Sequence, residues 1–173
     1  MKGNQLNKMK KTYKEKLHLN FRDLINNSAE KFKNRTAFLL KEGSNYSKVS
    51  YKKFREHYYR LCSSFIKMGL KGKRIAVVGK NCYEWVLSYV AGATVGVAVP
   101  VDKELSAEDI NNFVGAGECS AVCCEKKFEK EISEGVSVFS FEEIRKLASA
   151  DTAIDFEAVD GIEIKKDEMR VLI

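Results

Sequence analysis

The sequence lacks the short motifs that identify many nucleotide-binding and catalytic sites. It has no Gly-Lys-Ser/Thr phosphate loop, no Gly-x-Gly-x-x-Gly turn, no nucleophile elbow, no His-Glu-x-x-His pair and no calcium loop. Its 173 residues include one proline, one tryptophan and two histidines. These absences argue against the common P-loop, Rossmann, hydrolase and metalloprotease classes. With 45% hydrophobic and 31% charged residues, the composition is that of a folded globular protein rather than a disordered one.

The longest stretch without a charged residue is shorter than a membrane span. Trp85–Val101 has 17 uncharged residues, whereas a membrane span needs about 20 predominantly apolar ones. Gly92-x-x-x-Gly96 matches the close-packing motif of membrane helices, but strong soluble patterns flank it on both sides. The stretch therefore predicts a core helix that runs into a core strand.

Net positive charge is concentrated in one region. The formal net charge is +6, and residues 1–17 carry six Lys and one Glu, so the rest of the chain contributes only +1. We call residues 1–17 the basic extension. A basic tail on a nearly neutral fold does not predict a nucleic-acid partner, which needs Lys and Arg on one folded face. Two interpretations of the extension stay open: a solvated tail, or an interfacial helix with weak membrane-surface contact, since Leu6, Met9, Tyr13 and Leu17 recur at helical spacing.

The five cysteines are odd in number, at positions 62, 82, 119, 123 and 124. No secretory signal pattern precedes them, so we expect a cytoplasmic protein with free, buried thiols. A location at the membrane periphery is the alternative if the basic extension binds lipid. Cys119, Cys123 and Cys124 invite a metal interpretation, but structural zinc needs about four ligands in paired clusters. Neighbours in a strand point to opposite faces, so Cys123 and Cys124 should diverge. No metal site is predicted.

Strand and helix patterns alternate four times with short connections, which is typical of a parallel sheet wound with right-handed crossovers. The expected fold class is α/β, a mostly parallel sheet with helices on both faces, preceded by an N-terminal helix and a short strand pair. We expect residues 1–19 to be an extension and residues 20–173 the α/β unit. Expected helices are 20–32, 51–68, 81–94, 106–116, 128–133 and 140–148. Apolar residues recur regularly along 51–68, and the expected N-caps include Asn20, Ser106 and Ser140, the last with Glu143 three residues on. Expected strands are 37–40, 48–51, 75–78, 97–101, 121–124, 136–139 and 169–173, and residues 151–168 are expected to form a surface loop with a short strand at 161–164.

Open parallel sheets bind ligands at the carboxyl ends of their strands, here after Gly79, Val101 and Cys124. The segment that starts at Gly79 opens a helix whose N-terminus could receive a phosphate, with Asn81 as the expected cap and Glu84 three residues on. Asp102 directly follows a strand, as the phosphate-accepting Asp of a receiver domain does. Such a site also needs acidic residues at the end of an earlier strand, and the turn at Gly79 has none. The residues alone therefore indicate an α/β scaffold with no assigned catalytic, cofactor-binding or metal-binding residue.

Residues 70–110 resemble the adenylate-forming enzymes of the acyl-CoA synthetase family, most closely the long-chain fatty acyl-CoA ligase branch. An Asn-Pro near Asp102 and a Pro near Ser106, frequent in that branch, are absent. The order and spacing of the segments, rather than any one motif, make the resemblance specific, and it extends over residues 20–173. The matching positions are Gly72, Arg74, Ile75 and Ala76; Asn81, Glu84 and Trp85; Ala91 to Gly96; and Val99-Pro100.

The resemblance implies a parent enzyme that uses ATP and Mg²⁺ to join a carboxylate, expected to be a fatty acid, to AMP. CoA then displaces AMP and forms a thioester. In that family a strand such as 169–173 leads into the phosphate loop, so we expect the chain to be an N-terminal portion that is inactive alone and binds none of these cofactors. Asn81, Glu84 and Trp85 are then a cap and a packing anchor. Uncovered apolar residues at 171–173 predict self-association. The alternative is a self-contained flavodoxin-like binding or regulatory module.

Overall fold

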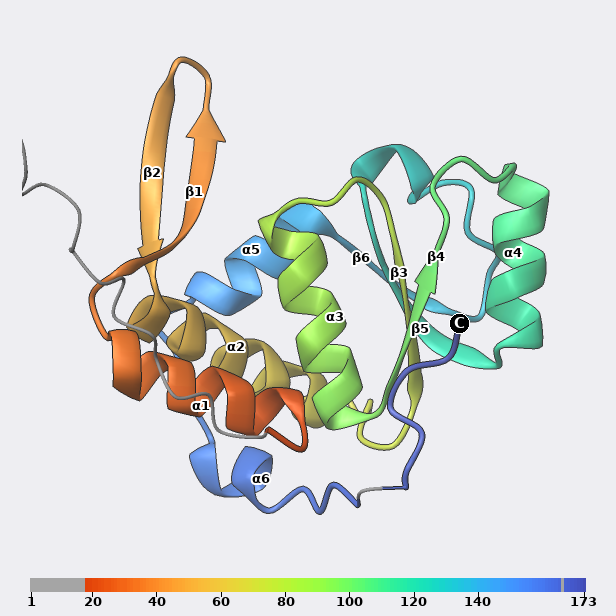
Figure 1. Cartoon of the computed structure of the whole chain (residues 1–173). Coiled ribbons are helices and arrows are strands. Elements are labelled where there is room, and N and C mark those ends of the chain that lie inside the picture. The colour runs from red at the N-terminus through yellow and green to blue at the C-terminus, as the bar shows by residue number, and fades with distance from the viewer. Residues whose placement is uncertain (1–17, 166) are drawn as a thin grey trace, which may run out of the picture.

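A four-stranded parallel sheet forms the centre of the computed structural model, which describes residues 18–165 and 167–173 (Figure 1). The elements, in chain order, are α1 (Phe21–Phe32), β1 (Thr36–Glu42), β2 (Asn45–Ser50), α2 (Tyr51–Lys67), β3 (Arg74–Val78), α3 (Tyr83–Val95), β4 (Val97–Val101), α4 (Ala107–Ala116), β5 (Cys119–Cys124), the 3₁₀ turn η1 (Lys126–Phe128), β6 (Ser137–Ser140), α5 (Phe141–Ser149) and α6 (Phe156–Asp160).

The strands lie in the order β4-β3-β5-β6, and all three neighbouring pairs are parallel. Ile75 of β3 faces Ala98 of β4 on one side and Ala121 of β5 on the other. Helix α3 carries the chain from β3 to β4, and α4 carries it back past β3 to β5. The winding direction thus reverses between β3 and β5, which places α3 and α4 on opposite faces of the sheet. The predicted fold class is confirmed.

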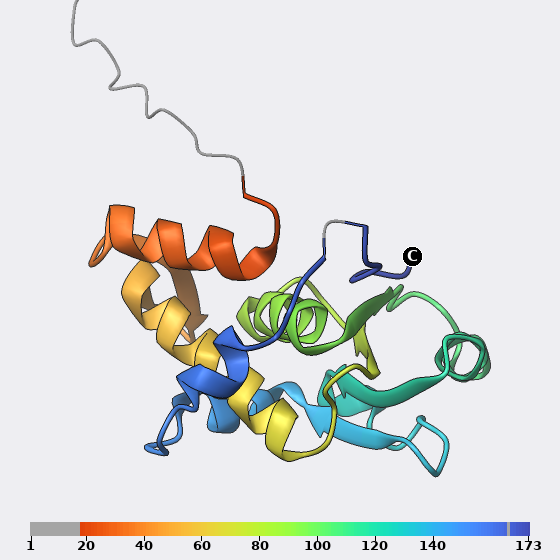
Figure 2. The ribbon, with the colours of Figure 1, turned by 90° about the horizontal axis from the view of Figure 1, so that it is seen from below.

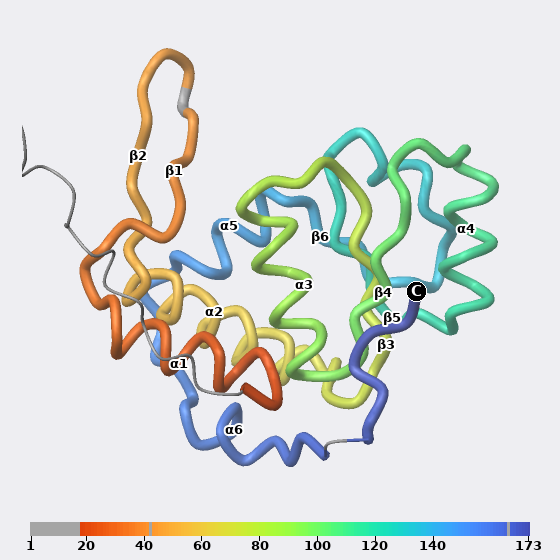
Figure 3. Tube along the Cα trace, in the orientation of Figure 1, coloured from red at the N-terminus to blue at the C-terminus, as the bar shows by residue number. Residues whose placement is uncertain are grey.

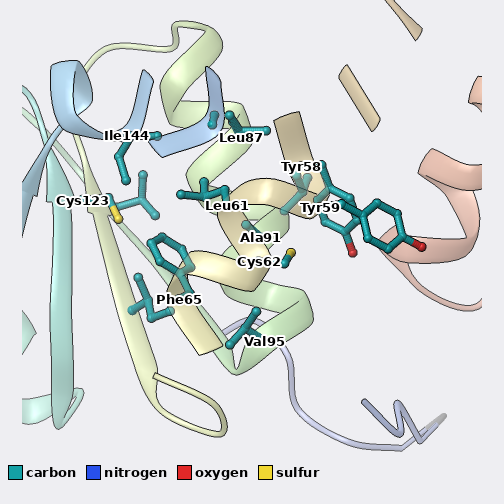
Figure 4. Packing of buried hydrophobic residues seen from close by; sticks show 14 of the residues in the cluster. Tyr58, Tyr59, Leu61, Cys62, Phe65, Leu87, Ala91, Val95, Cys123 and Ile144 are labelled. Atoms are coloured by element: carbon teal, nitrogen blue, oxygen red, sulfur yellow. The ribbon is translucent and has the colours of Figure 1, made fainter. Parts of the chain in front are cut away.

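Helices α2, α3 and α5 cover one face of the sheet, which we call the covered face (Figure 4). The regular apolar spacing of α2 puts Leu61 and Phe65 at its centre, both with no exposed surface. They meet Leu87 of α3, Ile144 of α5 and Cys123 of β5 in one cluster. This face holds the larger core of the molecule.

Helix α4 covers the opposite face, which we call the α4 face (Figure 1). Ile110 and Val114 of α4 pack with Ala76, Val78 and Val122 from the middle strands. Ser106 caps the helix as predicted, accepting a hydrogen bond from the Asp109 N–H at 3.1 Å. A single helix of ten residues therefore supplies most of the helical cover here.

The N-terminal elements attach to the outside of the covered face. Strands β1 and β2 form an antiparallel hairpin that projects from the body (Figure 3). Helix α1 packs on α2, and Asn20 caps it by accepting from the Asp23 N–H. The Arg22 guanidinium donates to the carbonyls of Val159, Asp160 and Ile162 at 2.7, 3.1 and 2.9 Å, which fastens the start of α1 to the end of α6.

Three predicted elements differ from the structure. The helix expected at 128–133 is only the short turn η1, and the segment 161–164 is not a strand but follows the unpredicted helix α6. The strand expected at 169–173 contributes one parallel bridge, Ala98 to Val171. The Ala98 N–H donates to Arg170 O at 2.9 Å, and the Leu172 N–H donates to Ala98 O at 3.0 Å. The C-terminal segment therefore lies on the outer edge of β4.

None of the helices in residues 18–165 and 167–173 has the length and apolar character that a bilayer crossing requires. The uncharged stretch Trp85–Val101 instead contains most of α3 and all of β4, as predicted. The interfacial helix considered for residues 1–17 falls outside the described residues, and that hypothesis and the division into residues 1–19 and 20–173 stay predictions.

Candidate functional site

A pocket of about 690 Å³ lies at the carboxyl ends of β3 and β5. Its walls come from β1 and the β1–β2 turn, from the turns after β3 and β5, and from the first turns of α3 and α5. The winding of the sheet reverses between β3 and β5, so this is the topological switch point at which open α/β sheets place their ligands. The pocket is large enough for a small organic ligand.

Gly79 makes possible the tight turn after β3, directly before the pocket residue Lys80. Its φ is +148°, and a Cβ at this position would lie 2.8 Å from Phe141 Cε2 and 2.9 Å from Glu125 Cγ. Any side chain here would therefore collide with α5 and with the turn after β5. The Lys80 N–H donates to Glu125 Oε1 at 2.6 Å, which ties the two strand ends together.

Glu84 is the most buried acidic side chain of the pocket, with 4% of its surface exposed. Its Oε1 accepts a hydrogen bond from Arg145 Nε at 2.6 Å, so the pair joins α3 to α5 across the pocket wall. The capping role expected of Asn81 and Glu84 is wrong. The N-cap of α3 is Cys82, which makes no side-chain capping bond, because the helix begins at Tyr83 and Glu84 turns inward to Arg145.

The pocket mixes charges of both signs beside an apolar wall. The cations are Lys41, Lys80, Lys126 and Arg145, and the carboxylates are Glu84, Glu125 and Glu142. Lys126 Nζ lies 3.8 Å from a Glu142 oxygen, both on exposed side chains, so this pair contributes little stability. Leu39, Tyr83 and Phe141 supply the apolar surface. Such a lining can hold a ligand that has both a polar and an apolar part.

The pocket does not contain an activated nucleophile or base among its described residues. Burial raises the pKa of the Cys82 thiol, with a smaller contribution from nearby Glu84, so the reactive thiolate is disfavoured. Behind the wall, His57 Nδ1 lies 2.8 Å from the Tyr83 hydroxyl, and burial lowers the pKa of His57 below its usual value. Neither the Cys82 thiol nor the His57 imidazole is charged by its surroundings at neutral pH.

The other predicted positions do not converge on the pocket. Asp102 Oδ1 accepts from the Glu104 N–H at 2.9 Å in a local turn after β4. Gly115 and Gly117 lie at the end of α4, as expected. Trp85 stacks on Tyr89 with ring centroids 5.3 Å apart, which agrees with its predicted packing role.

Cys123 and Cys124 lie on opposite faces of β5, as the strand geometry predicts: Cys123 belongs to the core of the covered face and Cys124 to that of the α4 face. Burial raises the pKa of each thiol to about 12. Within the part of the chain that the structure describes, no group of three His, Cys, Asp or Glu side chains could hold a metal ion.

Sequence reasoning missed Phe141, Glu125 and Arg145 as pocket residues. A signal for Phe141 was present, because the capping box of Ser140 and Glu143, confirmed here, fixes the start of α5 directly after β6. Since all four strands are parallel, that helix start had to reach the same edge as Gly79. The inward turn of Arg145 depends on the packing of α5 against α3 and has no local signal.

A four-stranded parallel sheet, wound in both directions and with a pocket at its switch point, defines a doubly wound α/β protein. A family model described as AMP-binding enzyme matches residues 25–170. The chain belongs to the AMP-binding enzyme family.

The fold is also that of several solved structures. A fatty acyl-adenylate ligase from L. pneumophila, in complex with acyl adenylate and pyrophosphate, superposes with a TM-score of 0.70 at 13% identity over 90% of this chain and 28% of that one. A Mycobacterium tuberculosis fatty acyl CoA synthetase gives a TM-score of 0.66 at 16% identity over 79% of this chain and 30% of that one.

The N-terminal subdomain of NpsA from Klebsiella oxytoca, in complex with 3-hydroxybenzoyl-AMSN, gives a TM-score of 0.62 at 19% identity over 76% of this chain and 32% of that one. The chain thus spans 28% to 32% of the length of these three structures and 14% of that of a matched nonribosomal peptide synthetase, FmoA3. A comparison with curated protein sequences finds no match.

Proposed function

We propose that this chain is the N-terminal part of an adenylate-forming enzyme that activates a carboxylic acid with ATP, with a fatty acid as substrate and a CoA thioester as final product. The family match over residues 25–170 carries the adenylate-forming part of the proposal. The fatty acid and CoA parts are supported by two matched folds, named as a fatty acyl-adenylate ligase and a fatty acyl CoA synthetase, and by the resemblance of residues 70–110 to long-chain ligases.

The cofactors of such a reaction are ATP, Mg²⁺ and CoA. The described residues do not fit a Mg²⁺–ATP site. The switch-point pocket has nearly balanced charges, Glu125 is held by the Lys80 N–H and Glu84 by Arg145, and no described cluster could hold a metal. We therefore assign no chemical step to residues of this chain.

Under this proposal the chain forms one rigid wall of the substrate-binding cleft of the enzyme. The middle strands are buried on both faces, and the Glu84–Arg145 pair and the Lys80–Glu125 bond fix the turns at the carboxyl edge. A rigid edge can position a substrate that other parts of the enzyme activate, because positioning supplies much of the rate gain in adenylate and phosphate transfer.

ATP–pyrophosphate exchange tests the proposal. The product of the complete coding sequence should exchange pyrophosphate when a fatty acid is present, and residues 1–173 alone should stay at the level of a buffer blank. A panel of fatty acids, aromatic acids and amino acids identifies the substrate class, and addition of CoA distinguishes thioester formation from release of the adenylate. If none of the acids in the panel supports pyrophosphate exchange by the complete protein, the proposal is contradicted.

One observation supports a second candidate function, a self-contained flavodoxin-like module. The strand order β4-β3-β5-β6 is the 2-1-3-4 order of flavodoxin-like sheets, which bind ligands at this same switch point. The two candidates differ in the coding sequence beyond residue 173. A Ser/Thr/Gly-rich loop with Lys in frame favours the ligase, and a stop codon favours the module.

Self-association is a further proposal. Met169 and Ile173 are largely exposed, and the outer edge of β4 carries only one bridge. A second copy that pairs with this edge would remove apolar surface and unpaired backbone groups from water. Sedimentation over a wide concentration range should show a dimer, and truncation before Met169 should change its dissociation constant.

A further inference from the structure

A histidine contact joins three elements at the wall of the switch-point pocket. His57 lies in the first half of α2, and its Nδ1 is 2.8 Å from the hydroxyl of Tyr83, which begins α3 and lines the pocket. The Tyr83 ring also packs edge-on against Phe38 of β1 and Phe54 of α2, with ring centroids 5.1 and 6.1 Å apart. We call Phe38, Phe54, His57 and Tyr83 the Tyr83 cluster.

One ring nitrogen of His57 has no hydrogen-bond partner. Its Nε2 is buried and bonds to no residue in 18–165 and 167–173. Burial raises the pKa of the Tyr83 hydroxyl, so this group keeps its proton and can donate it to Nδ1 of the neutral ring. Ser88 Oγ and Arg170 Nε are also buried without a partner, but of these three side chains only a histidine changes its charge between about pH 5 and 8.

The charged groups of α2 near His57 already form ion pairs with one another. Glu56 accepts from Lys53 Nζ at 3.2 Å and from Arg60 at 3.0 Å. Burial is the main cause that lowers the pKa of His57. Lys53 and, more weakly, Arg60 lower it further, and Glu56 partly opposes them. The protonated ring is therefore disfavoured on this side.

The other two elements of the Tyr83 cluster add no negative charge at the ring. Tyr83 of α3 keeps its proton, and the next carboxylate of α3, Glu84, accepts from Arg145 at 2.6 Å. Strand β1 contributes the ring of Phe38. A protonated imidazole can only donate hydrogen bonds, so in this arrangement the Tyr83 hydroxyl proton and the Nε2 proton of His57 would both lack an acceptor.

The β1–β2 hairpin is the part of the cluster that can move at the lowest cost. It has only two strands and projects from the body, and an isolated two-stranded hairpin is marginally stable in water. Helix α2 is anchored separately. Figure 2 shows its first turns beside α1 and its last turns toward the sheet, where Leu61 and Phe65 belong to the larger core. The hairpin can thus leave Tyr83 while that core stays packed.

We propose that His57 is an acid-sensitive latch on the wall of the switch-point pocket. With a neutral ring, Tyr83 stays bonded to Nδ1 and the hairpin stays packed on Tyr83. With a protonated ring, the hairpin lifts away so that water reaches the charge. Leu39, Leu40 and Lys41 of the hairpin line the pocket, so opening removes one of its walls in acid. The latch does not depend on which reaction the parent enzyme performs.

The direction of the pH effect follows from the lowered pKa of His57. In the open form the ring is in water and is protonated near the ordinary value of 6.5. The closed form stays neutral to a lower pH, so its stability relative to the open form is complete well above pH 6.5 and falls as the pH drops through 6.5. The ratio of open to closed molecules should rise by up to about tenfold between about pH 7.5 and 5.5.

Hydrogen exchange at about pH 7.5 and 5.5, corrected for the pH dependence of the chemical exchange rate, tests the latch. In the intact chain the amides of β1 and β2 should lose protection severalfold in acid, while the α2 amides at Leu61 and Phe65 keep theirs. His57→Gln, which cannot be protonated, should abolish this loss. The matched variant His18→Gln, at the only other histidine of the chain, should retain it. Equal losses in the hairpin and in α2, or an unchanged loss in H57Q, would overturn the proposal.

An NMR titration tests the latch with the native His57 side chain in place. The variant His18→Gln leaves one histidine, so its ring signals belong to His57. Their midpoint should lie below pH 6.5, and the amide signals of the hairpin should shift with the same midpoint. A midpoint at or above 6.5, or hairpin signals that do not follow the titration, would contradict the proposal.

Tyr83→Phe tests the hydrogen bond itself. It keeps the ring in the cluster but leaves Nδ1 of His57 without a partner in the closed form, so the hairpin should lose protection severalfold even at about pH 7.5. Tyr46→Phe is the matched control, because it removes a hydroxyl from a side chain of the same hairpin that is 63% exposed, and it should leave protection unchanged. Equal protection in the two variants would show that the bond to His57 does not hold the hairpin closed.

Discussion

The two faces of the central sheet are covered unequally. The covered face has three helices, and its core includes 23 buried residues from α1 through the segment after α6. The core of the α4 face has 10 buried residues, and α4 is its one full-length helix among the described elements. Both faces share the strands β3 and β5, whose side chains alternate between the two cores. The difference predicts that the covered face contributes most of the stability of the fold and that the α4 face opens locally while the covered face stays folded.

Truncation at the centre of the covered face should have the largest effect. Phe65 has no exposed surface, and its ring lies 6.1 Å from that of Phe139. Phe65→Ala should lower the free energy of unfolding by roughly 3–5 kcal/mol, because it leaves a cavity between α2 and the sheet. Urea denaturation measures the loss.

Phe113 on α4 is the matched control for that substitution. Its side chain is 56% exposed, so Phe113→Ala should change the free energy of unfolding by less than about 1 kcal/mol. A loss comparable to that of Phe65→Ala would show that the exposed side of α4 is packed in solution, and the comparison of the two faces would be wrong.

Two isoleucines compare the faces directly. Ile144 of α5 and Ile110 of α4 are both fully buried, on the covered face and the α4 face respectively. Each change to Ala should cost roughly 2–4 kcal/mol. Hydrogen exchange should then distinguish them: Ile110→Ala should speed exchange mainly in α4, whereas Ile144→Ala should speed it throughout the chain.

The opposite pattern would contradict this interpretation. If Ile110→Ala also accelerated exchange in α2 and β3, the α4 face would unfold only together with the whole molecule. The sheet would then have one cooperative core rather than a strong side and a weak side.

The ion pair at the carboxyl edge should have a smaller effect. Arg145→Met removes the donor from the buried carboxylate of Glu84 and should cost roughly 1–3 kcal/mol. Lys53→Met, which breaks an exposed i,i+3 pair with Glu56, should cost less than about 0.5 kcal/mol. Thermal unfolding at low and high salt provides the measurement. Equal losses would show that Glu84 is hydrated in solution.

The sequence predicts the sheet and its covering well because these follow from local patterns. The apolar spacing of α2, the apolar run 75–78 in β3 and the caps at Asn20, Ser106 and Ser140 are all confirmed. Each depends on residues within about one turn of each other, so no long-range information was needed.

The errors arise where tertiary contacts decide. Helix α6 has only five residues, too few for a helical apolar pattern to be recognised, and it is held by Arg22, which lies more than a hundred positions away in the chain. The inward turn of Glu84 depends on Arg145 of α5, so the local capping pattern at Asn81 was misleading. The switch-point pocket could be placed at the correct strand ends, and the cap at Ser140 brings the start of α5 to the same edge. Its β1 wall and the inward turn of Arg145 have no local signal.

The smallest effect expected is in the chemistry of two adjacent thiols, and it gives the most direct comparison of the faces. Cys123 lies in the core of the covered face and Cys124 in that of the α4 face, and burial raises the pKa of each to about 12. The ordinary thiol value is 9.0. Between pH 9 and 12 the unfolded chain therefore loses protons that the folded chain keeps. The stability that these thiols contribute is complete below pH 9 and falls as the pH rises from 9 through 12.

At pH 9 a thiol of pKa 12 is thiolate in only about one molecule in a thousand, so alkylation reports opening of the surrounding core. Two variants, Cys123→Ala and Cys124→Ala, each leave one of these two thiols for iodoacetamide, and tandem mass spectrometry distinguishes its adduct from those of Cys62, Cys82 and Cys119. The remaining Cys124 should react faster than the remaining Cys123, because α4 alone must move to expose it. Adding Ile110→Ala should accelerate Cys124 and leave Cys123 nearly unchanged. Equal rates in every background would mean that both thiols become accessible only through global unfolding, and that the thinner cover of the α4 face does not lower its local stability.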